Sequence, residues 1–454
     1  MGEYDAGDIR PEPEMDEQAA LPPQKRHRVA KNAAWLISGR IAQSLLALVV
    51  GALTARYLGP SNFGSINYAA SLTAFIAPVL YLGLNATLVR ELIKRPNREG
   101  EVLGTSLVIG FAASFVCFIG VCAFAFFVNA SETEIIIVCC LYSIGLLFRA
   151  ADMLQFWFQA KLQSKYYAIS TLIAYTAVSV YRIILLITHK SVYWFALSAV
   201  IDYGMIALVL FIAYRRRGGA KLSFSKTVAA EMFKTSKHYI LPALMVSIFA
   251  QTDKLMLQWM IGREVVGYYS AAATICGLSS IMCASIITSF RPIIFENKDK
   301  SEAAYEGSIT QLYSIIIYLS LAQCIGISLL NNELVSLLYE SAYAPAAPVI
   351  LVLVWYTGFS YIGAVRNIWI LGENKQKLLW KINLSGVACN VVLNLCLIPL
   401  WGMLGAATAS LVTQLFTNVV LGFVFRDIRH SNTLMARALN PKQMRLGALL
   451  TKRK

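Results

Sequence analysis

Charged side chains lie inside apolar stretches of this sequence that are long enough to cross a bilayer. Five of them are basic and three are acidic: Arg40, Arg149, Arg182, Lys254, Arg366, Asp152, Asp202 and Asp253. A charge at the bilayer centre costs about 2.5–3.5 kcal/mol even on insertion-based scales, so these residues are expected to bind a ligand or to pair with one another. The basic surplus favours an anionic ligand, held in a cationic cavity between helices.

Depth in the membrane separates the basic residues. At a helical rise of about 1.5 Å per residue, Arg149 falls near the midplane and Arg40 about 10 Å from the inner surface. For both, the alternatives are a place in the cavity or an ion pair with a buried acid, and Asp152 lies three residues after Arg149 on the same helix face. Arg182, Lys254 and Arg366 lie within about six residues of a span end, where snorkelling to the interface is the alternative.

The acidic and amide side chains have two interpretations as well. Asp202, near the midplane, and Asp253, beside Lys254, could bind a coupling Na⁺ or proton, or could pair helices through an arginine. Asn383, Asn390 and Asn394 recur at helical spacing and share one face. Buried amides can contact sugar hydroxyls, but they also join helices by hydrogen bonds, and packing is the interpretation that we favour.

The composition indicates the kind of protein in which these residues lie. The chain has 454 residues, of which 57% are hydrophobic and 14% charged, with a net charge of +15. A soluble domain is about half apolar and a quarter charged, so this chain cannot cover a water-soluble globule. The basic residues sit between apolar runs, which argues against nucleic acid as a partner. Scattered histidines and cysteines within apolar stretches predict neither a metal site nor a disulfide framework.

Apolar runs of about 20 residues mark the expected membrane spans. They lie near 33–57, 64–88, 102–128, 134–158, 167–188, 192–214, 238–260, 266–290, 308–331, 346–371, 379–400 and 403–425. The prediction is an all-α polytopic membrane protein with about twelve transmembrane helices. They form two six-helix bundles, 33–215 and 238–426.

Lysine and arginine gather on alternate linkers, which predicts that both termini lie in the cytoplasm and that the chain is a multi-pass protein of the cell membrane. Three polar segments are expected on that side: a disordered leader over 1–32, a basic linker over 216–237 and a basic tail over 427–454. The tail either lies on the anionic inner leaflet or is simply solvated. Trp157 and Trp194 are predicted to belong to the aromatic belts at the membrane interfaces.

The two bundles contain a repeated turn. Gly59 and Gly64 have counterparts in Gly262 and Gly267, offset by 203 residues, and small residues follow in both copies. Both turns link an outward-going helix to an inward-going one. The bundles are therefore expected to be related by a parallel pseudo-repeat, an arrangement found in transporters.

Four segments resemble the polysaccharide flippase family of the Wzx or O-antigen type, which shares a superfamily with multidrug exporters of the MATE type. They are RYLGPSNFG at 56–64, QFWFQA at 155–160, TDKLML at 252–257 with VGYYSAA at 266–272, and NVVLNL at 390–395 with the Ile398-Pro399, Gly402 and Gly405-Ala406-Ala407 that follow. The resemblance covers nearly all of the span region, from about residue 32 to about residue 426. The first 31 residues match nothing in that family.

The resemblance implies a two-lobed transporter that turns a polyprenyl-pyrophosphate-linked oligosaccharide from the inner to the outer leaflet by alternating access. Its partners would be that lipid-linked oligosaccharide, membrane lipid, and polymerases or glycosyltransferases of polysaccharide biosynthesis. The alternative with the same architecture is a cation-coupled multidrug exporter of the MATE type, although a site for cationic drugs would favour acids. An enzyme is not expected, because every predicted external linker is short and no phosphate-binding loop motif is present.

Overall fold

The protein is helical throughout the part that the structure describes, residues 23–443, and no strand occurs there. The structure is a computed structural model. Side chains are described from Ser44 onward, apart from those at positions 45, 281 and 442. The predicted leader therefore lies mostly outside the described residues, as does the end of the predicted tail.

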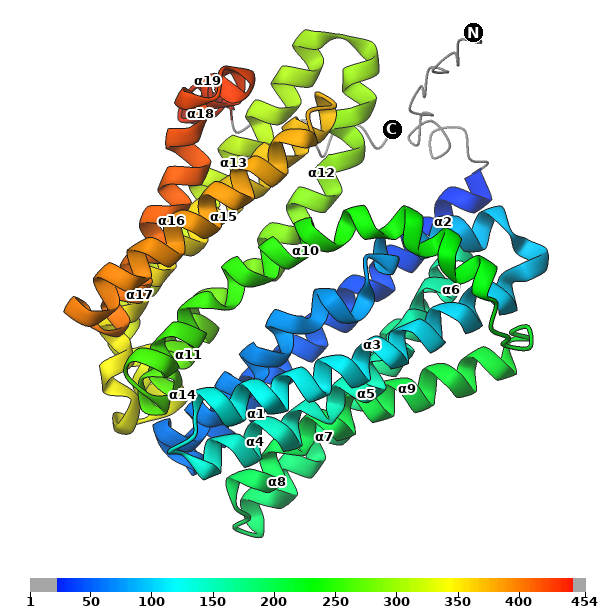
Figure 1. Cartoon of the computed structure of the whole chain (residues 1–454). Coiled ribbons are helices and arrows are strands. Elements are labelled where there is room, and N and C mark those ends of the chain that lie inside the picture. Colours follow the sequence, from blue (N-terminus) through cyan, green and yellow to red (C-terminus); the bar gives the residue numbers. More distant parts are fainter. Residues whose placement is uncertain (1–22, 444–454) are drawn as a thin grey trace, which may run out of the picture.

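The helices form two lobes that are joined by one long helix (Figure 1). The N-lobe contains α1 (Pro23–Tyr81), α2 (Leu84–Lys94), α3 (Glu99–Val128), α4 (Thr133–Ser143), α5 (Gly145–Arg149), α6 (Leu154–Ala160), α7 (Lys165–Ile187), α8 (Val192–Ala196) and α9 (Ser198–Arg216). Helix α10 (Lys226–Met260) follows. The C-lobe contains α11 (Arg263–Gly277), α12 (Ser280–Lys300), α13 (Glu302–Leu329), α14 (Asn331–Tyr339), α15 (Ala347–Gly372), α16 (Lys377–Trp401), α17 (Met403–Leu415), α18 (Leu421–Val424) and α19 (Arg429–Ala438).

Short 3₁₀ and π segments join several of these helices. The 3₁₀ segments are η1 (Pro96–Arg98), η2 (Ala150–Met153), η3 (Ser341–Ala346), η5 (Arg426–Ile428) and η6 (Pro441–Gln443). The π-helical segment η4 (Phe416–Val420) continues α17 into α18. Of these segments, η2 and η4 lie inside spans and continue them, because the backbone hydrogen bonding goes on in another register.

Ten helices of the described region are long and apolar enough to span a membrane, and eleven if the bent pair over 263–300 is one span. The first of the ten covers Leu46–Lys94, and Gly59 at φ 71° and ψ 170° breaks its helical geometry. Counted as two segments, it matches the predicted spans 33–57 and 64–88. The fold is thus the all-helical polytopic membrane fold that was predicted, with about twelve spans.

Several boundaries differ from the prediction. Helix α1 begins at Pro23, inside the expected leader, and α10 begins at Lys226, inside the expected basic linker. The expected tail contains α19, whose Leu434 and Ala438 are buried against neighbouring helices. The reason is the same in each case: these helices extend past the apolar core, where hydropathy no longer marks them.

Three apolar cores hold the two lobes. One core contains residues of both lobes, including Ala55, Tyr68, Ala271 and Tyr343, at the end where the lobes meet. A second core lies within the N-lobe and the beginning of α10, and a third lies within the C-lobe. The lobes therefore share a core at one end, here called the joined end, and keep separate cores toward the other.

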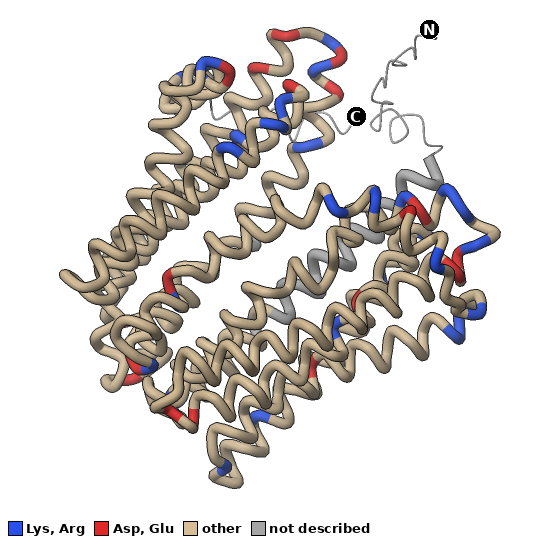
Figure 2. The backbone as a smooth tube through the Cα atoms, in the orientation of Figure 1, with Lys and Arg blue, Asp and Glu red and all other residues tan. Residues whose placement is uncertain are grey.

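Lysine and arginine gather at that other end, where the lobes diverge (Figure 2). We call it the basic end; it carries the linkers that the sequence assigns to the cytoplasm. The joined end has few basic residues, among them Arg56 and Arg263, and both of these pair with glutamates. Trp157 does not lie in an aromatic belt as predicted, because it is 3% exposed and packs edge-on against Tyr214 in the N-lobe core.

Candidate functional site

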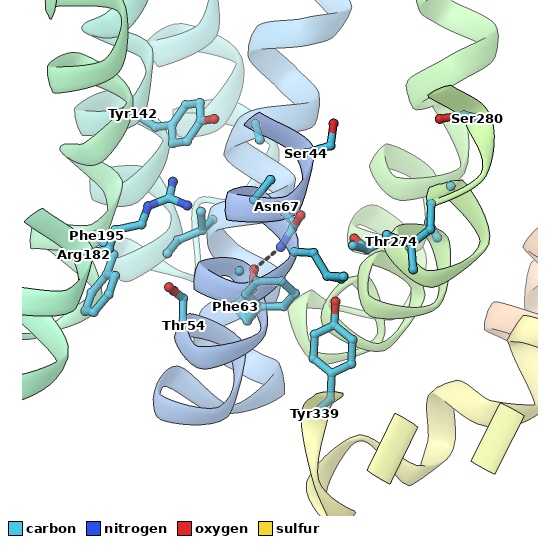
Figure 3. Close-up of a pocket in the computed structure, with 18 residues that line it drawn as sticks. Ser44, Thr54, Phe63, Asn67, Tyr142, Arg182, Phe195, Thr274, Ser280 and Tyr339 are labelled. Carbon is cyan, nitrogen blue, oxygen red and sulfur yellow. Dashed lines mark hydrogen bonds between the residues drawn. The ribbon is translucent and has the colours of Figure 1, made fainter. Parts of the chain in front are cut away.

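A cavity of about 380 Å³ lies between the lobes, next to the joined end (Figure 3). Both halves of α1, together with α4, α7 and α8, line it from the N-lobe, and α11, α12 and α14 line it from the C-lobe. Its polar lining residues are Ser44, Thr54, Asn67, Tyr142, Arg182, Thr274, Ser280 and Tyr339. No Asp or Glu is among its described lining residues, so its single charged group is a cation.

Arg182 supplies that charge from α7. Its Nε and one Nη donate hydrogen bonds to Oγ of Ser198 at 3.2 and 2.9 Å. Asp202 lies one turn further along α9, within electrostatic range of Arg182, and its Oδ1 has no hydrogen-bond partner among the described residues. Arg182 therefore lies in the wall of the cavity and does not snorkel to the membrane interface.

The joined end closes the cavity on one side. Arg56 donates hydrogen bonds to the carbonyl oxygens of Leu337 and Leu338, the latter at 2.9 Å, and its guanidinium lies 3.2 Å from Glu340. Tyr343 donates to the carbonyl oxygen of Ala55 at 2.9 Å. These contacts join α1 of the N-lobe to the α14–η3 segment of the C-lobe. The sequence analysis treated that segment as a plain linker.

Two further features lie at the joined end. Arg263, at the start of α11, pairs with Glu134 of the N-lobe at 2.6 Å. Tyr339 of α14 lines the cavity itself, and burial raises its pKa to about 12, so its hydroxyl stays protonated at neutral pH.

The repeated glycines meet one another at the joined end. A Cβ atom on Gly64 would lie 1.8 Å from the carbonyl oxygen of Arg263, and one on Gly267 would lie 2.1 Å from that of Pro60. Each copy of the repeat therefore packs its backbone against the other, which only glycine permits. Gly59 and Gly262, with φ of 71° and 132°, form the two turns. The parallel repeat predicted from the 203-residue offset is thus an inter-lobe contact.

Arg149 and Asp152 belong to a group that we call the N-lobe charge layer, completed by Arg182 and Asp202. Arg149 lies over the rings of Tyr81 and Tyr203, at 5.9 and 5.2 Å from their centroids. Tyr81 donates a hydrogen bond to Asp152 at 3.1 Å. No ion pair joins Arg149 to Asp152, because each side chain is engaged by tyrosines: Arg149 by the two rings and Asp152, within η2, by the Tyr81 hydroxyl. Their mutual compensation acts at longer range, through Tyr81.

Asp253 lies at the centre of a second group, the Asp253 cluster. Its Oδ2 accepts hydrogen bonds from Tyr269 and Ser410, both at 2.5 Å, and its Oδ1 accepts from Asn394 at 2.8 Å and Asn390 at 3.4 Å. The expected arginine partner is absent from the described part of the chain, and neutral donors from three other helices take its place. Oδ1 of Asn394 is buried without a partner.

The remaining predicted residues lie apart from the inter-lobe cavity. Arg366 and Asn383 line a separate cavity of the C-lobe, and Lys254 is half-buried without a hydrogen-bond partner among the described residues. Arg40 lies in α1, but its side chain is outside the described residues.

Several polar residues of these sites were not among those predicted from the sequence, notably Tyr81, Tyr269 and Ser410. The available signal was their position: Tyr269 and Ser410 stand among the small residues of two motifs, where a polar side chain can approach another helix.

Comparisons with known proteins agree with this architecture. A family profile described as "Polysaccharide biosynthesis protein" matches residues 29–298. The capsular polysaccharide biosynthesis protein CapF of Staphylococcus aureus is 22% identical over 414 residues, which cover 88% of this chain and 100% of CapF. The probable flippase AglR of Haloferax volcanii is 21% identical over 225 residues, which cover 48% of this chain and 47% of AglR.

Solved structures share the fold at low sequence identity. An inward-facing multidrug resistance transporter of the MATE family superposes with a TM-score of 0.70 at 13% identity, over 88% of this chain and 96% of that one. The lipid II flippase MurJ, in an inward closed conformation, superposes with a TM-score of 0.69 at 12% identity, over 92% of this chain and 93% of MurJ. Because the family profile matches more than half of the chain, the protein belongs to the polysaccharide biosynthesis protein family.

Proposed function

We propose that this protein moves a polyprenyl-pyrophosphate-linked oligosaccharide from the inner to the outer leaflet of the cell membrane by alternating access. Family membership and the similarity to the probable flippase AglR support this proposal. In this orientation the basic end faces the cytoplasm, together with both termini, because positive loops stay on the cytoplasmic side.

The charge of the inter-lobe cavity carries the proposal. Arg182 is its charged residue and no acid occurs among the described residues that line it. A guanidinium in a low-dielectric cavity stabilises a pyrophosphate, whereas it repels a cationic drug. The fold is shared by drug exporters and by a lipid flippase, so the fold alone does not separate the two functions. The cavity's charge favours the anionic cargo.

Alternating access follows from the way the lobes are joined. The lobes diverge toward the basic end, so a polar head group can enter there while its lipid tail stays in the bilayer (Figure 1). Opening toward the other side requires the joined end to separate. The contacts that would break are the hydrogen bonds of Arg56, the bond from Tyr343 to Ala55 and the Arg263–Glu134 pair. The Arg56 and Arg263 contacts are partly exposed and of modest net strength, whereas the Tyr343–Ala55 bond is buried in the core that both lobes share, which must separate as well.

The coupling ion is part of the same proposal. The Asp253 cluster would hold a Na⁺ ion or a proton, because it offers a carboxylate, hydroxyl oxygens and the unpartnered Oδ1 of Asn394. Hard cations prefer such oxygen ligands. A bound cation would offset the buried carboxylate and link α10 to α16 and α17. Asp202 is the corresponding candidate for binding the coupling ion in the N-lobe, because its Oδ1 has no hydrogen-bond partner among the described residues.

Partner enzymes complete the proposed setting. A glycosyltransferase must build the oligosaccharide on the cytoplasmic leaflet, and a polymerase or transferase must consume it on the other. The transporter itself makes and breaks no covalent bond in this scheme. Membrane lipid is its solvent, and nucleic acid is not a ligand.

Reconstitution into liposomes tests the proposal. Purified protein is expected to move a labelled lipid-pyrophosphate oligosaccharide across the bilayer, and Arg182→Gln is expected to lose most of that movement. Arg437→Gln, which alters a surface arginine of α19, is the matched control and should flip normally. Folded protein that leaves the labelled lipid in place but exports organic cations would replace the flippase by the drug exporter.

The ion is tested by imposing Na⁺ or H⁺ gradients in the same vesicles and, independently, by unfolding the protein at different Na⁺ concentrations. Sodium should raise the unfolding temperature of the wild type and not of Asp253→Asn. A sodium shift that persists in Asp253→Asn places the ion elsewhere. If a proton gradient changes the rate of flipping and a Na⁺ gradient does not, the ion held by Asp253 is assigned as a proton.

A further inference from the structure

Arg366 of α15 is a buried cation without an anionic partner. It is 5% exposed, and no carboxylate lies within ion-pair distance of it in the described part of the chain. One Nη donates to the carbonyl oxygen of Thr417, the other lies 3.4 Å from Oδ1 of Asn367, and Nε has no hydrogen-bond partner. A buried charge that is left incompletely paired is costly, so its retention calls for a ligand.

A cavity of about 250 Å³ adjoins this guanidinium. It lies between α10, α15, α16 and α17 with its π-helical continuation, and it shares no lining residue with the inter-lobe cavity. A single water needs only about 10–15 Å³ of such space, so the cavity has room for a larger polar ligand. Four side-chain amides line it beside Arg366: Asn367, Asn383, Gln414 and Asn418. No Asp or Glu is among its described lining residues.

Hydrogen bonds between helices hold two of the polar side chains that line this cavity. The wide turn of η4 leaves the carbonyl oxygen of Thr417 available to Arg366. Asn418 is fixed by hydrogen bonds to the carbonyl oxygen of Phe359 at 2.9 Å and to Gln414 at 2.6 Å. A Cβ on Gly363 would lie 2.5 Å from Oδ1 of Asn418, so glycine is needed there. The site is therefore preorganised.

Asn383 lines this cavity with an amide that the described residues leave unbonded. It is half-buried and has no hydrogen-bond partner among the described residues. Its amide can donate and accept at once, as a sugar hydroxyl can. A guanidinium that lacks an acid provides the complementary group for a carboxylate or a phosphate ester.

We propose that this C-lobe cavity binds an acidic sugar unit, with Arg366 on its carboxylate and the amides, Asn383 among them, on its hydroxyls. The inference rests on the proposed function for the source of the ligand, since the transported oligosaccharide would supply the sugar. The site would then select cargo that carries a negative charge on the glycan, beyond the pyrophosphate common to all such carriers.

Binding is measured on the full chain in nanodiscs with three soluble probes: glucuronate, glucose and inorganic phosphate. Wild-type protein is expected to bind glucuronate at least about tenfold more tightly than glucose. Asn383→Leu replaces the amide by an apolar side chain of similar size without removing a hydrogen bond of the fold, and it should abolish glucuronate binding while the unfolding temperature stays unchanged. Arg366→Lys keeps the charge but loses the planar fork, and it should weaken binding at least about tenfold.

Arg437→Gln again serves as the matched control and should bind glucuronate like the wild type. Equal binding of glucose and glucuronate overturns the inference, as does glucuronate binding that survives both cavity variants. Binding of phosphate without glucuronate also overturns it, because the site would then hold a free anion. Protein that binds glucuronate but flips no lipid-linked oligosaccharide refutes the proposed function alone, and protein that flips but binds no glucuronate refutes this inference alone.

Discussion

The two lobes handle buried charge in opposite ways. In the N-lobe, two cations and two acids share one layer, and Arg149, Asp152, Arg182 and Asp202 lie within electrostatic range of their neighbours. On the C-lobe side, Asp253 and Arg366 have no hydrogen-bond partner in common. Neutral donors surround Asp253, and a carbonyl and an amide oxygen accept from Arg366.

This difference separates structural charge from charge that is available to ligands. Opposite charges in one layer compensate each other, so most of the N-lobe layer can be maintained without a ligand, and Arg182 is the member that also lines the inter-lobe cavity. The Asp253 carboxylate and the Arg366 guanidinium are hydrogen-bonded by neutral groups alone, so each retains an unsatisfied field. The C-lobe side is thus suited to bind a cation at one place and an anion at another.

The largest expected effect comes from Asp253→Ala. The change leaves the Tyr269 and Ser410 hydroxyls without their acceptor, and each unsatisfied buried group costs about 1–3 kcal/mol. It also removes one of the two hydrogen bonds that each of the amides of Asn390 and Asn394 donates. We expect a loss of at least about 3 kcal/mol in the free energy of unfolding, measured by denaturation in detergent. Asp427→Ala, at an exposed carboxylate of η5, should change it by less than about 0.5 kcal/mol. Equal effects of the two changes would show that the Asp253 cluster adds little to stability.

Double-mutant cycles compare the lobes directly. Asp152→Asn and Arg149→Gln should each destabilise the N-lobe, and together they should cost at least about 1 kcal/mol less than their sum, because the second change removes the charge that the first left uncompensated. Asp253→Asn and Arg366→Gln should add within about 0.5 kcal/mol, because the two residues share no partner. Strong coupling on the C-lobe side would contradict the separation of its charges.

Removing one tyrosine hydroxyl from each of the two charged groups compares the lobes in a second way. Tyr269→Phe removes a bond of 2.5 Å to Asp253, and Tyr81→Phe removes one of 3.1 Å to Asp152. Hydrogen bonds to charged groups contribute about 1.5–3 kcal/mol, and the shorter bond serves the carboxylate whose hydrogen bonds all come from neutral groups. Tyr269→Phe should therefore lower the unfolding temperature more than Tyr81→Phe. The reverse order would indicate that the N-lobe layer depends on Tyr81 more than on its charges.

The smallest effect is expected from Lys254→Met. Lys254 has no hydrogen-bond partner in the described region and lines neither cavity. The substitution keeps most of the apolar stem, so the free energy of unfolding should change by less than about 0.5 kcal/mol and flipping in liposomes should persist. A large loss of flipping by well-folded Lys254→Met would return this residue to the transport path.

Much of the fold could be predicted from the sequence, because a membrane span is a local property. Twenty apolar residues form a helix in lipid whatever their neighbours are, since every backbone polar group must be satisfied internally. The same reasoning fails inside the fourth span, where Arg149 and Asp152 contact tyrosines of other helices and form no ion pair, although their spacing predicts one. It also fails for Trp157, because an aromatic residue near a span end can face the core as well as the interface.

The candidate sites could be predicted only in part. All three asparagines were expected on one face of a helix, yet Asn390 and Asn394 contact Asp253 while Asn383 lines the cavity beside Arg366. Periodicity gives the face of a helix and not its neighbour. Asn394 is 141 residues from Asp253, and no local pattern joins them.

By itself, the sequence determined the order and approximate number of the spans, the excess of basic over acidic residues within them, and the repeat centred on Gly64 and Gly267. These features follow from hydropathy, charge and the spacing of residues, which are local properties of the chain. The tertiary structure alone decided which charges compensate each other, that the two repeats pack backbone to backbone, and that Arg182 and Arg366 line separate cavities. Those outcomes depend on how helices distant in sequence dock, because a buried charge is stabilised only by the groups that docking brings within a few ångströms of it.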